Sequence, residues 1–170
     1  MSLATVPLIP ADGTITITDG AALSWTLIYE DGDFQATGLK KGQMAHVVIK
    51  DRGIPSSVRD TERDESIGFS FSCHAMAVVG DNTTATIGDI VMRLKVWAAA
   101  TSTLPTAGGD TFCVTITFTG ERTNFGATSD TTLVLKYCHL TGDFSEGIPG
   151  KWAIKGEAFC YSTDYLTATG

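Results

Sequence analysis

Residues 67–79 read IGFSFSCHAMAVV and form the longest alternating run in the chain. Ile67, Phe69, Phe71 and Cys73 fall on one face of an extended strand, and the glycine, serine and histidine positions between them fall on the other. A sheet with one buried face and one polar face produces this pattern. The stretch therefore predicts a β-strand and, with it, a mainly β fold.

Seven other segments show the same period of two or a strong β propensity. They are residues 14–18, 23–30, 33–37, 43–50, 111–119, 131–141 and 152–163. The Asp31-Gly32 pair between two of them predicts a hairpin, because glycine accepts a positive φ. Only residues 86–97 change to a helical period, and Thr86 and Asp89 have the spacing of a capping box at its start. We therefore predict an antiparallel β-sandwich or half-barrel of about seven or eight strands, with one flanking α-helix at about 86–97.

The length of 170 residues predicts one domain, residues 1–170, in which residues 1–12 form an extended N-terminal arm. Charged residues make up 18% of the chain. This is below the roughly 25% of a typical soluble domain, so we expect a surface that is largely neutral or covered by partners. The first residues lack the pattern of a signal peptide and no apolar run has the length of a membrane span, so no membrane partner is expected.

The formal net charge is −7. Holding nucleic acid through its phosphates requires clustered lysine and arginine, so an acidic chain of this kind is not expected to bind DNA. It is compatible instead with a passage through which DNA moves without adhering, because like charges repel.

Residues 51–66 read DRGIPSSVRDTERDES and lack the apolar spacing of a regular element. We predict a long charged loop here, and such loops in compact domains are usually functional or disordered. Interleaved charges of both signs favour pairing with another protein surface. The predicted subunit-interface residues are Asp51, Arg52, Arg59, Asp60, Glu62, Arg63, Asp64 and Glu65.

The sequence offers little for catalysis or metal binding. The chain has no glycine-rich phosphate loop and no Gly-x-Ser-x-Gly elbow. Cys73-His74 and Cys138-His139 are neighbour pairs, and adjacent strand residues point to opposite faces, so neither pair aims both groups at one ion. The acids of residues 51–66 lack the regular ligand spacing of a calcium loop. We predict a non-enzymatic protein with no catalytic residue, no metal and no cofactor.

Four cysteines, at 73, 113, 138 and 160, lie far apart in the sequence. Without a signal peptide, reduced thiols are the expected state. The alternation predicts that Cys73 and Cys160 fill the core, and that Cys113 and Cys138 face the more polar side.

Four short motifs, taken in order, resemble the major tail tube proteins of long-tailed (siphovirus-like) bacteriophages. They are YEDGDF at 29–34, VVIKDRG at 47–53, VRD at 58–60 and IGFSFS at 67–72, and a single short helix follows them. The resemblance implies a virion protein, assembled in the host cytoplasm, whose copies form hexameric rings stacked into a non-contractile tube. It also implies that a long loop or hairpin reaches the next ring and that residues 50–66 occupy its place. The implied partners are the chain itself, other tail proteins such as the tape measure and the terminator, and DNA that passes through the lumen without specific binding.

Two alternatives remain open. One is a different phage structural component, namely a tail terminator, a head-tail connector or a capsid decoration protein. The other is a β-sandwich module that binds carbohydrate, which would need a platform of exposed aromatic residues. The chain has three tryptophans, at 25, 97 and 152, and two of them fall on positions expected to face the core.

Overall fold

The computed structural model describes residues 13–28, 33–39, 44–51, 54–64, 66–74, 86–104, 112–120, 130–147, 150–159 and 166–168. Twelve elements lie in these ranges. The strands are β1 (Gly13–Thr18), β2 (Ser24–Ile28), β3 (Gln35–Thr37), β4 (Met44–Asp51), β5 (Ile54–Asp64), β6 (Ile67–His74), β7 (Val114–Gly120), β8 (Thr131–Ser145), β9 (Lys151–Ala158) and β10 (Leu166–Ala168). The helical elements are α1 (Ile87–Val91) and the 3-10 helix η1 (Lys95–Ala99). The predicted mainly β fold with one short helical segment is confirmed.

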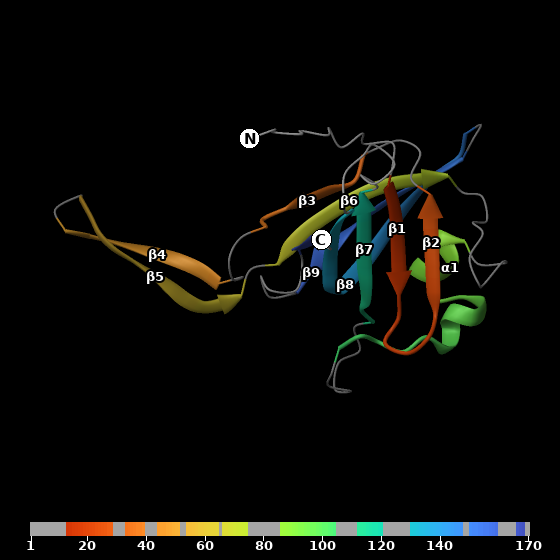
Figure 1. Cartoon of the computed structure of the whole chain (residues 1–170), viewed down its shortest axis with the longest axis horizontal. Coiled ribbons are helices and arrows are strands. Elements are labelled where there is room, and N and C mark those ends of the chain that lie inside the picture. Colours follow the sequence, from red (N-terminus) through yellow and green to blue (C-terminus); the bar gives the residue numbers. More distant parts are fainter. Residues whose placement is uncertain are drawn as a thin grey trace, which may run out of the picture.

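One antiparallel sheet forms the body of the molecule (Figure 1). Seven of its strands follow the order β2-β1-β7-β8-β9-β6-β3, and β10 pairs with β8 off this path. The predicted Asp-Gly hairpin between β2 and β3 is wrong, because these strands lie at opposite ends of the sheet order. The chain crosses from one sheet edge to the other between them, and β3 pairs with β6 instead.

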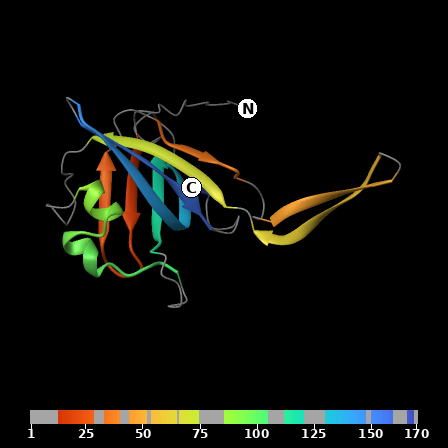
Figure 2. The ribbon, with the colours of Figure 1, turned by 180° about the vertical axis from the view of Figure 1, so that it is seen from behind.

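A β-bulge in β8 divides the sheet into two halves. Val114 of β7 pairs with Cys138 and Ile116 pairs with Leu135, so β8 carries one extra residue at this point. Tyr137, within the bulge, has a φ of 55°. Bulges bend the strand that carries them, and β6 runs obliquely behind β1 and β7 in Figure 1 and in front of them in Figure 2. The sheet is therefore a bent half-barrel with one continuous buried face.

The core lies inside this bend. Ile15, Ile17, Ile116 and Leu135 from one half meet residues of β6 and β9 from the other half in a single buried cluster. Phe34 joins the two halves, because its ring stacks on Phe118 of β7 with centroids 4.9 Å apart and also contacts Phe71 of β6 at 6.2 Å.

The helical segment covers the core face of the sheet. Thr86 caps α1, and both halves of its capping box with Asp89 are present, which confirms the predicted helix start. The helix is shorter than the predicted 86–97, because α1 ends at Val91 and a turn separates it from η1. Arg93 and Lys95 in this stretch have φ values of 54° and 53°, which interrupt a continuous helix.

The predicted loop at residues 51–66 is largely a strand. Residues 54–64 form β5, which pairs with β4 in a separate two-stranded sheet. A strand buried on one face alternates apolar and polar residues, whereas a hairpin that packs on no other sheet has no need of that pattern. The sequence of β5 lacks this alternation, and the prediction of a loop at residues 51–66 is therefore wrong.

Candidate functional site: an assembly surface

The β4–β5 hairpin projects away from the body of the molecule (Figures 1 and 2). Its two strands pair with each other and with no other strand among the described residues. The pairing is irregular at two places, between Met44 and His46 and between Ile49 and Lys50. A two-stranded hairpin alone in water is marginally stable at best. The projecting hairpin is therefore an element that contact with another surface would stabilise.

The predicted interface residues gather on this hairpin. Asp51 ends β4, and Arg59, Asp60, Glu62, Arg63 and Asp64 lie on β5. Arg59 pairs in register with Val47, and Asp60 pairs with His46. Arg52 and Glu65 lie outside the described residues. The structure thus brings six of the eight predicted residues onto one projecting element.

The outer edge of β2 is a second candidate surface. β2 pairs with β1 on one side, and no described strand pairs with its other side. Natural sheets protect such edges with charged residues, proline or bulges. The sequence of β2, SWTLI, contains neither a charge nor a proline, and its register with β1 is regular. As far as the described strands show, this edge is therefore open to pairing with a strand of another molecule.

The outward face of β1, β2, β7 and the first part of β8 carries threonines in rows, and we call it the threonine face. Its hydroxyl residues are Thr14, Thr16, Thr18, Ser24, Thr26, Thr115, Thr117, Thr119 and Thr132. They alternate with buried core residues such as Ile15 and Ile17, and all nine are half-buried. Thr16 pairs with Thr26 on one side and Thr117 on the other, and the hydroxyls of Thr16 and Thr26 lie 3.2 Å apart. The sequences of β1, β2 and β7 contain no charged residue.

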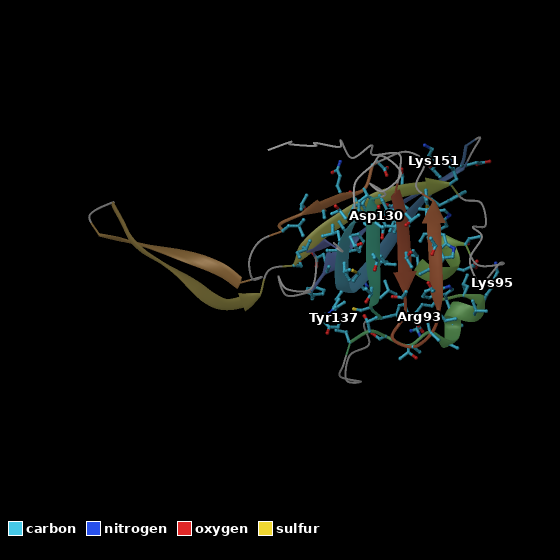
Figure 3. The ribbon with its side chains drawn as sticks, viewed as in Figure 1. Arg93, Lys95, Asp130, Tyr137 and Lys151 are labelled. Carbon is cyan, nitrogen blue, oxygen red and sulfur yellow. The ribbon has the colours of Figure 1, made fainter. Side chains whose placement is uncertain are left out.

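The outward face of the other sheet half has a different chemistry. Asp143 of β8 and Lys155 of β9 form an exposed ion pair with an N–O distance of 2.9 Å, and Glu157 lies two residues along β9. Figure 3 places Lys151 at the opposite end of the sheet from Tyr137, the residue of the bulge. The strands β1, β2 and β7 therefore carry an uncharged outward face, whereas the face beyond the bulge is charged. Lys136 of β8, next to the bulge residue Tyr137, lies at the border between the two.

The corner between α1 and η1 is held by a buried carboxylate. Asp89 accepts hydrogen bonds from the backbone N–H and the hydroxyl of Thr86, and forms a 2.9 Å ion pair with Lys95. Burial opposes its ionisation, but the bonds from Lys95 and Thr86 outweigh burial and hold the pKa of Asp89 below its usual value. This corner presents three exposed apolar side chains to solvent: Met92, Leu94 and Val96.

A cavity of about 310 Å³ lies between α1 and the sheet. Its lining includes Ile90, Phe112 and Leu140, with Arg93 and His139 as the basic members. The Arg93 guanidinium stacks over the Phe112 ring at 4.6 Å from its centroid. Among the described lining residues there is no carboxylate and no serine, so in this part of the lining His139 has neither an acidic partner nor a hydroxyl nucleophile to activate.

The described cysteines are buried, and no disulfide joins them. Cys73, Cys113 and Cys138 form no disulfide, as expected for the reduced state, and Cys160 lies outside the described residues. Burial, with a smaller contribution from Asp33, raises the pKa of Cys73 to about 12, and burial also raises the pKa of Cys113. A thiol of raised pKa carries little thiolate at neutral pH and is a poor nucleophile.

Two cysteines lie on the opposite side from the one predicted. Cys113 and Cys138 are buried rather than on the polar face. The extra residue of the bulge reverses the alternation of β8, which turns Cys138 inward. Cys113 precedes β7, and its backbone is covered by residues 102–103 through hydrogen bonds with Ser102 and Thr103.

Within the described ranges, no group of three or more His, Cys, Asp or Glu residues is placed to hold a metal ion. No helix in that part of the chain is long and apolar enough to cross a membrane. Trp25 and Trp97 are fully buried, at 1% and 0% exposure, and therefore add nothing to an exposed aromatic platform.

No family model matches the chain, and comparison with curated proteins and with solved structures gives no match.

Proposed function

We propose that the chain is a tail tube subunit of a long-tailed bacteriophage or a phage-derived particle. In this role its copies form stacked, hexameric rings around a conduit for DNA, and the protein performs no catalysis. The sequence resemblance supplies the family, and the projecting β4–β5 hairpin is the observation that carries the proposal. A projecting hairpin that pairs with no other described strand of its own chain fits a function in which it packs on the next copy.

The other surfaces support self-association. The unprotected edge of β2 is suited to continue a sheet from one copy into the next, and closing such edges in a ring removes an aggregation hazard. A head-to-tail contact between identical copies closes into a ring or continues as a filament. The net charge of −7 suits a conduit that must not retain DNA.

In the proposed assembly, the hairpin of one ring lies against the adjacent ring. Arg59, Asp60, Arg63 and Asp64 of β5 form ion pairs there with the neighbouring copy. Charges of both signs on one short strand fix the register of a contact, because like charges disfavour the wrong alignments.

Electron microscopy of the purified protein at high concentration tests the proposal. We expect open-ended tubes of constant width. Isolated rings that do not stack would instead indicate a tail terminator or a head-tail connector. A protein that stays monomeric at every concentration, with or without other tail components, would refute the proposal.

A further inference from the structure

We infer that the threonine face is the surface of the tube wall that faces the passing DNA. The inference rests on the proposed function and adds to it an assignment of the face that lines the lumen. The strands concerned are β2, β1, β7 and the part of β8 before the bulge.

The first argument is the chemistry of this face. A double helix is held by lysine and arginine side chains that replace its counterions, so a wall that lets DNA slide must present few cations. The sequences of β1, β2 and β7 contain none. The threonine hydroxyls keep the wall wetted, and some of them already bond to one another, as Thr16 does with Thr26. The part of the wall formed by β1, β2 and β7 is therefore polar but carries no charge that would hold a phosphate.

The second argument is the contrast within the same sheet. Beyond the bulge, the outward face carries Lys155 and Lys151 together with acidic residues. A lumen lined by that half would place lysines against the polyanion in every copy of every ring. The outward face of β1, β2 and β7 avoids such contacts, and Lys136 of β8, next to the bulge, lies at its border.

The third argument is the open edge of β2, which is independent of the chemistry of the face. The rows of the threonine face run across the strands, from β2 through β1 and β7 to β8. The edge of the sheet that these rows reach is the unprotected edge of β2. A strand of the next copy added at that edge would continue the rows around the ring. The helical segment lies behind β1 and β2 in Figure 1 and in front of them in Figure 2, on the side away from the lumen.

A labelling experiment on assembled tubes tests the inference. Thr117→Cys is made in a Cys160→Ser background, in which the remaining thiols are buried. Tubes are assembled first and then reacted with a maleimide-linked gold cluster small enough to enter the open ends. The inference predicts gold density on the channel side of the wall in averaged electron micrographs. Lys155→Cys, in the same background, is the matched variant from the charged half, and its density is expected away from the channel.

The outcomes separate the inference from the proposed function. Tubes with gold at the outer surface for Thr117→Cys would overturn the inference and leave the tube function standing. The same holds if Thr117→Cys and the neighbouring Thr16→Cys both prevent assembly, because the face would then be a subunit interface. Failure of the unsubstituted chain to form tubes would refute the proposed function itself.

A charge variant gives a second readout. Thr117→Lys lies in the centre of the face, and Thr26→Lys lies on the β2 edge. The Thr117→Lys variant is expected to form tubes. At low salt these tubes should retain at least about tenfold more short DNA than unsubstituted tubes, and this difference should disappear as the salt concentration rises. Thr26→Lys is expected to block ring closure, because lysine on an edge strand disfavours strand addition. Equal DNA retention by Thr117→Lys and unsubstituted tubes would overturn the inference.

Discussion

The carboxylate of Asp19 accepts a hydrogen bond from the backbone N–H of Thr101, 82 positions further along the chain, at 3.0 Å. The same carboxylate accepts bonds from the N–H groups of Ala21 and Leu23, at 3.0 and 2.9 Å. Asp19 is only 8% exposed. One buried side chain therefore closes the turn between β1 and β2 and ties it to the segment that follows η1.

Replacing Asp19 by alanine should destabilise the fold. The variant leaves three backbone donors without their acceptor, and bonds to a charged group contribute more than neutral ones. We expect Asp19→Ala to lower the free energy of unfolding by about 3 kcal/mol, measured by urea denaturation. Asp143→Ala removes an exposed ion pair and should change the free energy of unfolding by less than about 1 kcal/mol. Equal effects of the two substitutions would contradict the role given to Asp19.

Gly156 of β9 is a position where a side chain does not fit. A Cβ there would lie 2.0 Å from the carbonyl oxygen of His139 and 2.7 Å from the Phe69 ring. Because the closer obstacle is backbone, a change of rotamer cannot relieve it. We expect Gly156→Ala to cost at least about 2 kcal/mol in the same assay. The exposed neighbouring substitution Glu157→Ala should have an effect within about 0.5 kcal/mol.

The corner at Asp89 should make stability depend on pH in a defined direction. Its pKa is lowered in the folded state, so its contribution is complete above the unfolded value of about 3.9 and is lost as pH falls through the folded value. Asp89→Asn should therefore be less stable than the unsubstituted protein at neutral pH. The difference in unfolding free energy should shrink below about pH 4. A difference that is constant from pH 7 to about pH 3 would contradict this account.

The three described thiols should be protected until the protein unfolds. Cys73, Cys113 and Cys138 are buried, and the pKa values of Cys73 and Cys113 are raised by burial. In a Cys160→Ser variant, mass spectrometry should find almost no maleimide adduct at neutral pH under native conditions and three adducts in urea. Rapid labelling of the native variant would show that the half-barrel opens readily.

Several elements were predictable from the sequence because each has a local cause. The alternation at residues 67–74 and 14–18 reflects one buried face, and both segments are strands. The pair Thr86 and Asp89 marks the start of α1, since a capping box needs only residues three apart.

The errors arose where distant parts of the chain decide the structure. The Asp31-Gly32 pair is typical of a hairpin turn, yet β2 pairs with β1 and β3 pairs with β6. The side of the sheet on which Cys138 lies depends on the bulge at Tyr137. Tyr137 has a positive φ, but no glycine stands at this position to indicate it in the sequence. The charge cluster of β5 is visible in the sequence, but its strand is not, because β5 lacks a regular alternation of apolar and polar residues.

Charge reversal on the hairpin is the sharpest test of assembly. In the proposed tube, Arg59 and Arg63 of β5 pair with acidic groups of the neighbouring copy. The double variant Arg59→Glu, Arg63→Glu should fold as a monomer, because β5 pairs only with β4 among the described strands and the main sheet forms without either. It should fail to form tubes, since like charges would then meet at the contact. Folding is checked by circular dichroism and urea unfolding, and tubes by electron microscopy.

A control with the same change in net charge is available on β9, where Lys151→Glu and Lys155→Glu replace two lysines away from the hairpin. That variant loses as much positive charge as the arginine variant. It is expected to form tubes, because its substitutions do not touch the proposed contact between rings. If the arginine variant formed tubes as readily as the lysine variant, the charges of β5 would have no part in assembly. If both variants failed, net charge rather than a specific contact would control polymerisation. Only if tube formation is lost in the arginine variant and kept in the lysine variant is the contact between rings assigned to the hairpin.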